Sequence, residues 1–323
     1  MPETPATQPA ILTVTLNPAL DLSADAPQVV PGPKLRLSAP VFEPGGGGIN
    51  VARAIDILGG QARVLAALGG VTGARMAEMI TGAGLDLLPF ALPGETRQSL
   101  SVTDRRDGQQ YRFILPGPQW AAALSDDLLA RIAAAAAPGG WVVLSGSQPP
   151  GVADDFALQL AARLTDSGAR LVVDTSGSAL QHLVAGGHSP APWCLRMDQA
   201  EAEEAAGRAL PTPADSLDFA GELVARGVAQ VVVLARGADG SVLAGARQRL
   251  HCRPPEVPVQ SKTGAGDSFT GALVLALAQG DDIAGALRRA TAAAAAAVMT
   301  GASALCRRDD AERLVQGCVI TRP

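Results

Sequence analysis

The chain has 323 residues, of which 47% are hydrophobic and 18% charged, a composition that indicates a folded globular protein and excludes an intrinsically disordered one. The net charge is −5 and there is no dense block of Lys and Arg, which argues against a general nucleic-acid binder, so an anionic ligand would need local basic residues. The four cysteines lack CxxC spacing, and no apolar run predicts a signal peptide or a membrane span, so we expect a cytoplasmic protein with reduced cysteines.

The first part of the chain predicts an irregular start followed by a strand. Residues 1–9 are rich in Pro and Thr and are expected to be disordered. Ile11–Leu16 predicts a strand that ends at Asn17-Pro18, and Asp21 follows that end. Ligands of open α/β sheets gather at the carboxyl ends of strands, so Asp21 is a candidate ligand contact. A solvated loop carboxylate is the alternative.

A glycine-rich turn comes next. Lys34–Arg36 and Val41-Phe42 alternate partly between polar and apolar, which predicts a short exposed pair of strands outside the main sheet. Gly45–Gly48 cannot form the core of a strand, and these glycines allow a ligand to approach the backbone closely. Asn50 is expected to open an apolar helix that runs to Leu58. We interpret the stretch as a binding turn, with a flexible linker as the alternative.

Two alternating stretches, 96–103 and 110–114, predict a hairpin around a polar turn. Arg97 and Arg112 would then project from neighbouring strands and can form a clamp for an anion. Each can equally be an ordinary surface arginine.

Strand and helix patterns alternate through the rest of the chain. Each predicted strand ends in a polar or Gly-rich loop, and repeated βα units imply a mainly parallel sheet covered by helices on both faces. The predicted strands are 61–68, 141–144, 171–173 and 231–234, and the predicted helices are 72–83 and 154–167.

Acidic residues at the ends of these strands are candidate metal ligands. Asp174 follows the strand at 171–173, where a metal or a phosphate donor can approach. Asp198 and Glu201 lie one helical turn apart on the same face, and such a pair can hold Mg²⁺ through water. The alternative is that these carboxylates only form the acidic first turn of a helix.

The segment Lys262–Ser268 carries the clearest chemical signal. The small and apolar run 269–278 predicts a buried helix, so Gly264-Ala265-Gly266 lies at its N-terminus, where free N–H groups and the helix dipole favour an anion such as phosphate. Asp267 then lies beside this anion site, and accepting a proton from an attacking hydroxyl is the role that an Asp plays in phosphoryl transfer. A loop with a helix cap is the alternative.

Taken together and in order, these motifs resemble the PfkB/ribokinase family of sugar kinases over nearly the whole chain. Within the family the chain looks most like the 6-phosphofructokinase isozyme 2 type, because Gly47 stands where related kinases carry Lys in the Gly-rich turn. The matching segments are Leu16–Asp21, Lys34–Arg36, Ala39–Ile55, Thr96–Gln98, Gln110–Phe113, Ser145–Gly151, Asp174, Gly264–Ser268, Leu305-Cys306 and Asp309-Asp310.

The resemblance implies a role for each matching position. It implies that Asp267 is the base that activates the sugar hydroxyl, and that the amides of Gly264, Ala265 and Gly266 form the anion hole. The positions implied for the sugar phosphate are Asp21, Lys34, Gly45, Gly46, Asn50, Arg97, Arg112 and Ser147. Those implied for the nucleotide are Asp198, Arg236, Gly237, Gly240, Lys262, Thr263, Gly264 and Gly266, with Asp174 and Glu201 near the metal.

The same resemblance implies one ribokinase-like α/β domain over residues 1–323, with a small lid of strands at about 20–43 and 96–114. It implies transfer of phosphate from ATP to the C1 hydroxyl of fructose 6-phosphate, giving fructose 1,6-bisphosphate in glycolysis. The resemblance implies that Mg²⁺ is the metal, and it allows an additional monovalent cation such as K⁺. It also implies a homodimer that forms through the lid. The alternatives are a 1-phosphofructokinase, a tagatose-6-phosphate kinase and a sugar-phosphate sensor without catalysis.

The chain departs from the family pattern near the nucleotide. Asp198 replaces the usual Asn, Arg196 stands where Lys is common, and Ala235 replaces a Ser or Thr before the loop glycines. Lys262 occupies a position usually filled by Thr or a similar residue. We expect Lys262 to supply positive charge near the phosphates and so to offset Asp198.

Overall fold

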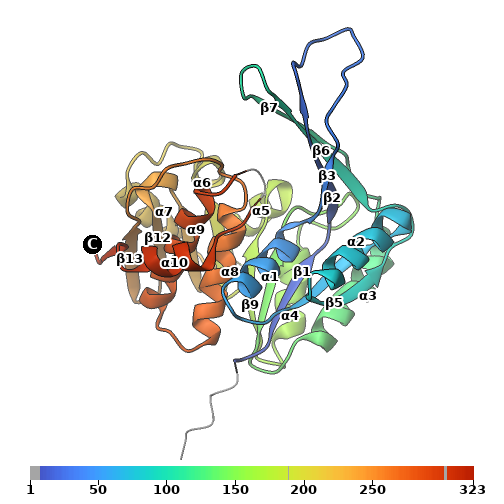
Figure 1. The fold of residues 1–323 in the computed structure, drawn as a ribbon. Coiled ribbons are helices and arrows are strands. Elements are labelled where there is room, and N and C mark those ends of the chain that lie inside the picture. The colour runs from blue at the N-terminus through green and yellow to red at the C-terminus, as the bar shows by residue number, and fades with distance from the viewer. Residues whose placement is uncertain (1–7, 188, 302–303) are drawn as a thin grey trace, which may run out of the picture.

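The computed structural model describes residues 8–187, 189–301 and 304–323. Figure 1 shows a body in which helices cover both faces of a long sheet, and a narrow second sheet that projects from it. Of the nine residues expected to be disordered, 1–7 lie outside the described residues, whereas Gln8 forms two hydrogen bonds with Gln61, at 2.8 and 3.3 Å.

The body is organised around a sheet of ten strands in the order β14-β13-β12-β11-β10-β9-β8-β1-β4-β5. Neighbours from β5 to β11 are parallel, and the last three strands at the other edge are antiparallel. The strands are β1 (Ile11–Thr15), β4 (Arg63–Leu68), β5 (Asp86–Ala91), β8 (Trp141–Ser145), β9 (Arg170–Asp174), β10 (Cys194–Asp198), β11 (Val231–Ala235), β12 (Ser241–Gly245), β13 (Gln248–Arg253) and β14 (Val319–Thr321).

Helices pack on both faces because the central strands are apolar on both sides. Val142 of β8 faces one core with α3 to α7, whereas the next residue, Val143, faces a second core with α1, α8, α9 and α10. The helices are α1 (Gly47–Ile57), α2 (Gly70–Gly82), α3 (Ala122–Ala135), α4 (Phe156–Leu164), α5 (Gly177–Val184), α6 (Gln199–Ala206), α7 (Pro213–Ala225), α8 (Ala265–Ala278), α9 (Ile283–Val298) and α10 (Arg308–Val315), with a 3₁₀ turn η1 (Gly237–Asp239). The predicted α/β class with a mainly parallel sheet between helices is confirmed.

The projecting sheet has four strands in the order β3-β2-β6-β7, and a loop at 27–40 joins its first two strands (Figure 1). Its strands come from the two segments expected to form a lid: β2 (Ala19–Ala26), β3 (Val41–Gly45), β6 (Arg97–Asp104) and β7 (Gln110–Ile114). The predicted hairpin is the β6–β7 pair, in which Ser101 lies opposite Arg112. We call these four strands and the loop 27–40 the lid.

Two local predictions in this region are wrong. The expected strand pair of Lys34–Arg36 with Val41-Phe42 does not form, since β3 pairs with β2 and Lys34–Arg36 lies in the exposed loop. The apolar residues Leu20 and Ala24 give β2 a buried side, which Lys34–Arg36 lacks.

The helix after the glycine turn also starts earlier than predicted. It begins at Gly47, three residues before Asn50, with Gly46 at the N-cap in a conformation of φ 131°. A glycine cap offers no side-chain signal in the sequence. Asn50 therefore lies inside the first turn of α1 and not at its start.

Candidate active site

Asp267 lies in the first turn of α8. Gly264 caps the helix in the left-handed region, at φ 77°, which suits glycine. Helix α1 packs closely against α8 at Gly271, which has no side chain. A Cβ at this position would lie only 3.0 Å from the Cβ of Ala54. This close packing brings the side chain of Asn50 to Asp267, and its Nδ2 donates to Oδ2 of the carboxylate at 3.0 Å.

The surroundings of Asp267 make it a better base than an ordinary aspartate. Burial raises the pKa of this carboxyl to about 7, and repulsion by Asp174 adds to the increase. The hydrogen bond from Asn50 and the charges of Arg196 and Arg53 act in the opposite direction. A base with a pKa near 7 binds a proton more strongly than an ordinary aspartate, and about half of it is ionised at pH 7.

Asp174 and Arg196 form a partly buried ion pair beside Asp267. Nη1 of Arg196 lies 3.4 Å from Oδ1 of Asp174, and the hydroxyl of Thr270 donates to the other oxygen at 3.2 Å. A Cβ on Gly266 would lie 3.1 Å from both terminal nitrogens of Arg196, so this guanidinium lies directly against the first turn of α8. Positive charge and free helix N–H groups therefore meet at one place, which suits an anion.

Four carboxylates surround that guanidinium. Burial alone would lower the pKa of Arg196, but Asp174, Glu201, Asp198 and Asp267 together raise it. Arg196 therefore stays positively charged, and the cluster keeps an excess of negative charge.

Asp198 and Glu201 form a capping box at the start of α6. The Asp198 carboxylate accepts from the Glu201 N–H at 2.9 Å, and the Glu201 carboxylate accepts from the Asp198 N–H at 2.8 Å. Locally, Asp198 and Glu201 therefore cap the start of α6, as the alternative of an acidic first turn predicts. Burial raises the pKa of Glu201, and repulsion by Asp198 and Asp174 contributes. Glu201 and Asp174 thus face a common region.

The lid brings a second polar group to the same end of the sheet. Ser99 of β6 donates to Asp21 of β2 at 2.5 Å, and a Cβ on Gly45 would collide with that carboxylate. Burial raises the pKa of Asp21, while the hydrogen bond from Ser99 and the charges of Arg97 and Arg112 oppose the increase. Both predicted clamp arginines therefore lie within electrostatic range of Asp21.

Arg97 is held at the hinge between lid and body. Its Nε and Nη2 donate to the Asn17 carbonyl oxygen at 3.2 and 3.0 Å. The Asn17 side chain in turn donates to Oγ of Ser147 at 3.4 Å. This connects Ser147, another predicted site residue, to the base of the lid.

Other predicted residues lie elsewhere. Lys34 is exposed in the loop 27–40, and Figure 1 shows this loop at the far end of the lid. Lys262 and Thr263 are exposed just before α8, and Gly237 and Gly240 flank the turn after β11.

The side chain of Arg236, which was predicted to bind the nucleotide, is held by other groups of the protein. Its side chain is 1% exposed, and its guanidinium donates to the carbonyls of Leu210 and Pro211, at 2.8 and 3.0 Å, and to the Ser216 hydroxyl. These bonds hold the connection between α6 and α7. An arginine next to loop glycines looks the same in the sequence whether it faces a ligand or the protein interior.

We expect Arg236→Met to destabilise the protein by about 3 kcal/mol, because it removes a buried charge with its hydrogen bonds. The Michaelis constant for ATP should stay within about twofold of wild type, because the side chain points into the protein. Thermal unfolding and steady-state kinetics test this. The matched control is Arg226→Met, whose guanidinium also bonds two backbone carbonyls, at 2.6 and 2.7 Å. An ATP constant raised in the Arg236 variant alone would restore the original assignment.

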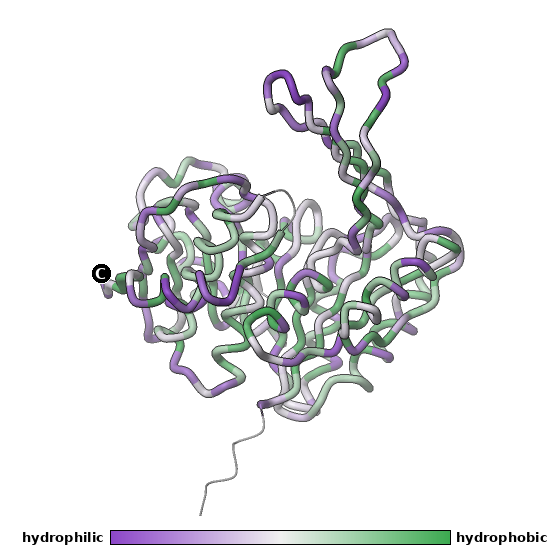
Figure 2. Tube along the Cα trace, viewed as in Figure 1, coloured by the Kyte–Doolittle hydropathy of each residue, from purple (hydrophilic) through white to green (hydrophobic). Residues whose placement is uncertain are grey.

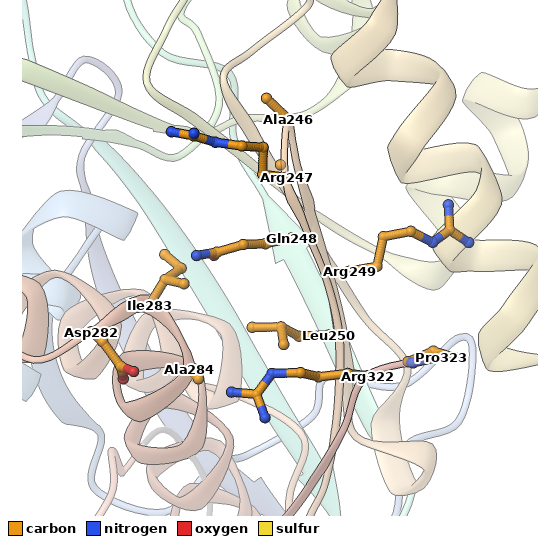
Figure 3. Close-up of a pocket in the computed structure, with 11 residues that line it drawn as sticks. Ala246, Arg247, Gln248, Arg249, Leu250, Asp282, Ile283, Ala284, Arg322 and Pro323 are labelled. Carbon is orange, nitrogen blue, oxygen red and sulfur yellow. The ribbon is translucent and has the colours of Figure 1, made fainter.

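A cavity of about 420 Å³ lies elsewhere, between the β12–β13 turn, the start of α9 and the C-terminal residues (Figure 3). Its lining includes Arg247, Gln248, Asp282 and Arg322, none of which belongs to the predicted site. The candidate active site is therefore defined by converging polar groups and not by this cavity.

Sequence reasoning gave no site role to three residues that lie at the site, although it noted Arg196 as a departure from the family pattern. Arg196, Thr270 and Arg53 all bond to predicted site residues or lie against them. Arg196 had a usable signal, since it lies two residues before Asp198 at the end of a buried strand. Thr270 sits one turn after Asp267 on the same helix, but a buried threonine carries no distinct signal.

Comparison with known proteins identifies the family. The family model described as "pfkB family carbohydrate kinase" matches residues 15–310. The chain belongs to the pfkB family of carbohydrate kinases.

Relatives of this pfkB kinase cover nearly its whole length. It is 39% identical to the ATP-dependent 6-phosphofructokinase isozyme 2 of Mycobacterium tuberculosis, over 96% of this chain and 90% of that protein. It is 37% identical to the isozyme 2 of Escherichia coli, over 94% and 97%. A 1-phosphofructokinase of Xanthomonas campestris is 32% identical, over 82% and 83%. The crystal structure of phosphofructokinase-2 from Escherichia coli in complex with potassium superposes with a TM-score of 0.89, at 36% identity, over 95% of this chain and 98% of the other.

The residues of this pfkB kinase fit a divalent cation held jointly with phosphates. Among the described residues, no three His, Cys, Asp or Glu side chains converge as a metal site of their own. Mg²⁺ commonly uses one or two carboxylates together with substrate phosphates and water. Asp198 and Asp174 repel the Glu201 carboxylate more than Arg196 attracts it, and a bound cation would relieve this repulsion. In the part of the chain that the structure describes, no helix has the length and apolar character needed to cross a bilayer.

The raised pKa of Asp267 predicts the pH dependence of the enzyme. A general base works when deprotonated, so kcat/KM should rise with pH through a midpoint near the Asp267 pKa of about 7. Substrate phosphates also titrate at about pH 6, so the informative measurement is a difference between variants. Asn50→Ala removes a hydrogen bond that lowers the pKa of Asp267, so its midpoint should move to higher pH. Equal midpoints in both proteins would show that Asp267 is not the titrating group.

Proposed function

We propose that this kinase transfers the γ-phosphoryl group of ATP to the C1 hydroxyl of fructose 6-phosphate, giving fructose 1,6-bisphosphate. The observation that carries the proposal is the position of Asp267, a carboxylate of raised pKa beside the free N–H groups of α8 and the guanidinium of Arg196. The relatives named 6-phosphofructokinase isozyme 2, at 37–39% identity, support the acceptor.

In the proposed reaction Asp267 accepts the proton of the C1 hydroxyl as the oxygen attacks the γ-phosphorus. A new O–P bond forms, the bond from phosphorus to the β-phosphate oxygen breaks, and ADP leaves. The amides of Gly264, Ala265 and Gly266 and the guanidinium of Arg196 stabilise the negative charge on the transferring group. No covalent intermediate with the protein is needed.

Asp174 and Glu201 are the residues proposed to hold Mg²⁺, together with ATP phosphates. When bound, the cation supplies positive charge to the phosphates and offsets the carboxylates around Arg196. The loop of Gly237 and Gly240, with Asp198, Lys262 and Thr263, is proposed to bind the rest of the nucleotide. A monovalent cation such as K⁺ is a further proposed component, supported by the potassium complex of the Escherichia coli enzyme.

The lid is proposed to bind the sugar phosphate. Asp21, Gly45, Gly46 and Asn50 would take the sugar hydroxyls, because the Asp21 carboxylate lies against Gly45 and Asn50 lies in the helix turn that follows Gly46. The arginines and polar groups at the base of the lid, with Lys34, would take the phosphate. These are Arg97, Arg112 and Ser147.

The lid is also proposed to form a homodimer. Hydrophobic side chains on β3, β7 and the adjoining loops are exposed, which Figure 2 shows as green segments along the lid. They are Leu35, Leu37, Val41, Phe113, Ile114 and Leu115.

The four free, buried cysteines fit a cytoplasmic enzyme.

A coupled assay of ADP release with a panel of sugar phosphates tests the function. Fructose 6-phosphate should give the highest kcat/KM, with fructose 1-phosphate and tagatose 6-phosphate as the competing acceptors. The relative named 1-phosphofructokinase, at 32% identity, makes fructose 1-phosphate the second candidate. Binding of fructose 6-phosphate without turnover would instead support a sensor.

A further inference from the structure

A line of hydrogen bonds connects the lid to Asp267. Nη2 of Arg53 lies 3.4 Å from Oε1 of Glu43, a residue of the lid strand β3. Nη1 of the same guanidinium donates to Oδ1 of Asn50 at 3.2 Å. The other end of that amide, Nδ2, donates to Asp267 at 3.0 Å. Arg53 therefore stands between the lid and the Asn50–Asp267 pair.

The local structure explains why these residues meet. Asn50 and Arg53 are three residues apart on α1, so their side chains share one face of the helix. Strand β3 runs directly into the glycine turn that precedes α1, which folds Glu43 back over that face. Glu43 also lies opposite Asp21 in the β2–β3 pair, so the line of contacts reaches the proposed sugar site.

Hydrogen-bond chemistry gives Arg53 control over the orientation of Asn50. A guanidinium only donates and an ionised carboxylate only accepts, whereas an amide has one donating and one accepting end. Only one orientation of Asn50 satisfies both neighbours, with Oδ1 toward Arg53 and Nδ2 toward Asp267. In the flipped orientation two oxygens would face each other at Asp267. Without Arg53, Oδ1 of Asn50 loses its donor in this line of contacts, and only the bond from Nδ2 to Asp267 holds the amide in the productive orientation.

We propose that Arg53 is a positioning residue, which fixes the Asn50 amide and through it the Asp267 carboxylate, and that Glu43 couples this device to the position of the lid. The inference rests on the proposed role of Asp267 as the base.

An ion pair with a purely structural role would affect the stability of the fold, whereas a positioning residue affects the rate of the reaction. The side chains of Arg53 and Glu43 are 26% and 27% exposed, and partly exposed pairs contribute little to stability. Removing Arg53 should therefore leave the fold intact while the base loses its alignment. Small misalignments of a reacting group have large effects on rate.

The test compares Arg53→Met with Arg63→Met. Arg63 also forms an ion pair, with Asp86 at 2.7 Å, but on the β4–β5 edge of the body. We expect Arg53→Met to lower kcat by about tenfold or more, with the Michaelis constant for ATP and the melting temperature near those of wild type. Arg63→Met should leave kcat unchanged. Equal kcat in the two variants would overturn the proposal.

Double variants decide whether Arg53 acts through Asn50. In an Asn50→Ala background, Arg53→Met should cause no further loss of kcat, because the amide that it orients is gone. Additive losses would overturn the proposal. Glu43→Gln should lower kcat by a smaller factor than Arg53→Met, and this loss should vanish in the Arg53→Met background. A Glu43→Gln loss that persists there would overturn the coupling to the lid.

These results are separable from the proposed function. If wild type phosphorylates no sugar phosphate, the function fails first. If wild type is active and Asp267→Asn is equally active, the role of the base fails. The positioning role fails when the wild type is active, Asp267→Asn is inactive, and Arg53→Met behaves like wild type.

Discussion

Asp267→Asn is expected to lower kcat by about 10²–10⁴-fold, because it removes the group that accepts the hydroxyl proton. The amide has the same shape as the carboxylate and can remain next to Asn50, so substrate Michaelis constants should change little. The fold should survive, since replacing a carboxylate of raised pKa by a neutral amide relieves its repulsion with Asp174. Steady-state kinetics and thermal unfolding of the same preparation measure both effects.

The control for this variant is Asp215→Asn. Asp215 is also an aspartate in the first turn of a helix, where it forms a capping box with Thr212 at the start of α7. Its loss should lower the melting temperature slightly, because the capping box is broken, without changing kcat. If Asp267→Asn keeps more than a tenth of wild-type turnover, the assignment of the base is rejected.

Arg196→Met is expected to lower kcat by about 10²–10³-fold, the cost typical of losing one group that stabilises charge in the transition state. The methionine side chain fills similar space but leaves Asp174 without its ion-pair partner. The melting temperature should therefore fall as well, because an unpaired, partly buried carboxylate remains. Activity must be expressed per folded molecule, measured at a temperature where both proteins are folded.

Arg196→Lys separates charge from shape. Lysine keeps a positive charge but lacks the planar guanidinium that lies against Gly266 and contacts Asp174. Most of the activity should return in this variant, whereas the melting temperature should recover only in part. Should the methionine variant turn over as fast as wild type, Arg196 would have a structural role only.

The body of the fold could be predicted from the sequence because its strands are continuously apolar and its helices follow them regularly. Strand β8, for example, is predicted at 141–144 and observed at Trp141–Ser145. Strand β2 was not predicted, because its alternation of polar and apolar residues is weak. Its pairing with β6 was not predictable either, because it joins residues such as Ala19 and Arg97, which are far apart in the sequence. Long-range pairing of this kind is not encoded in local periodicity.

The site could be predicted where one residue carries its chemistry in a local motif. Asp267 and its glycines are such a case, and the structure places them at a helix N-terminus as the spacing requires. Arg236 was misassigned because the sequence does not reveal the side to which a buried arginine turns. Arg53 was missed because its role depends on Glu43, Asn50 and a glycine turn that brings them together.

Asp21 and Asp267 belong to different parts of the fold: Asp21 lies in the small projecting sheet, and Asp267 lies in the first turn of a helix of the body. If the lid binds the acceptor as proposed, substitutions in β2, β6 and β7 would change the choice of acceptor without disturbing the helix that carries the proposed base. Related kinases could in this way differ in the sugar phosphate that they accept while they share the same phosphoryl transfer. The salt bridge of Arg53 with Glu43 joins the lid to α1, so a substitution in the lid that breaks it would also change the rate of the reaction.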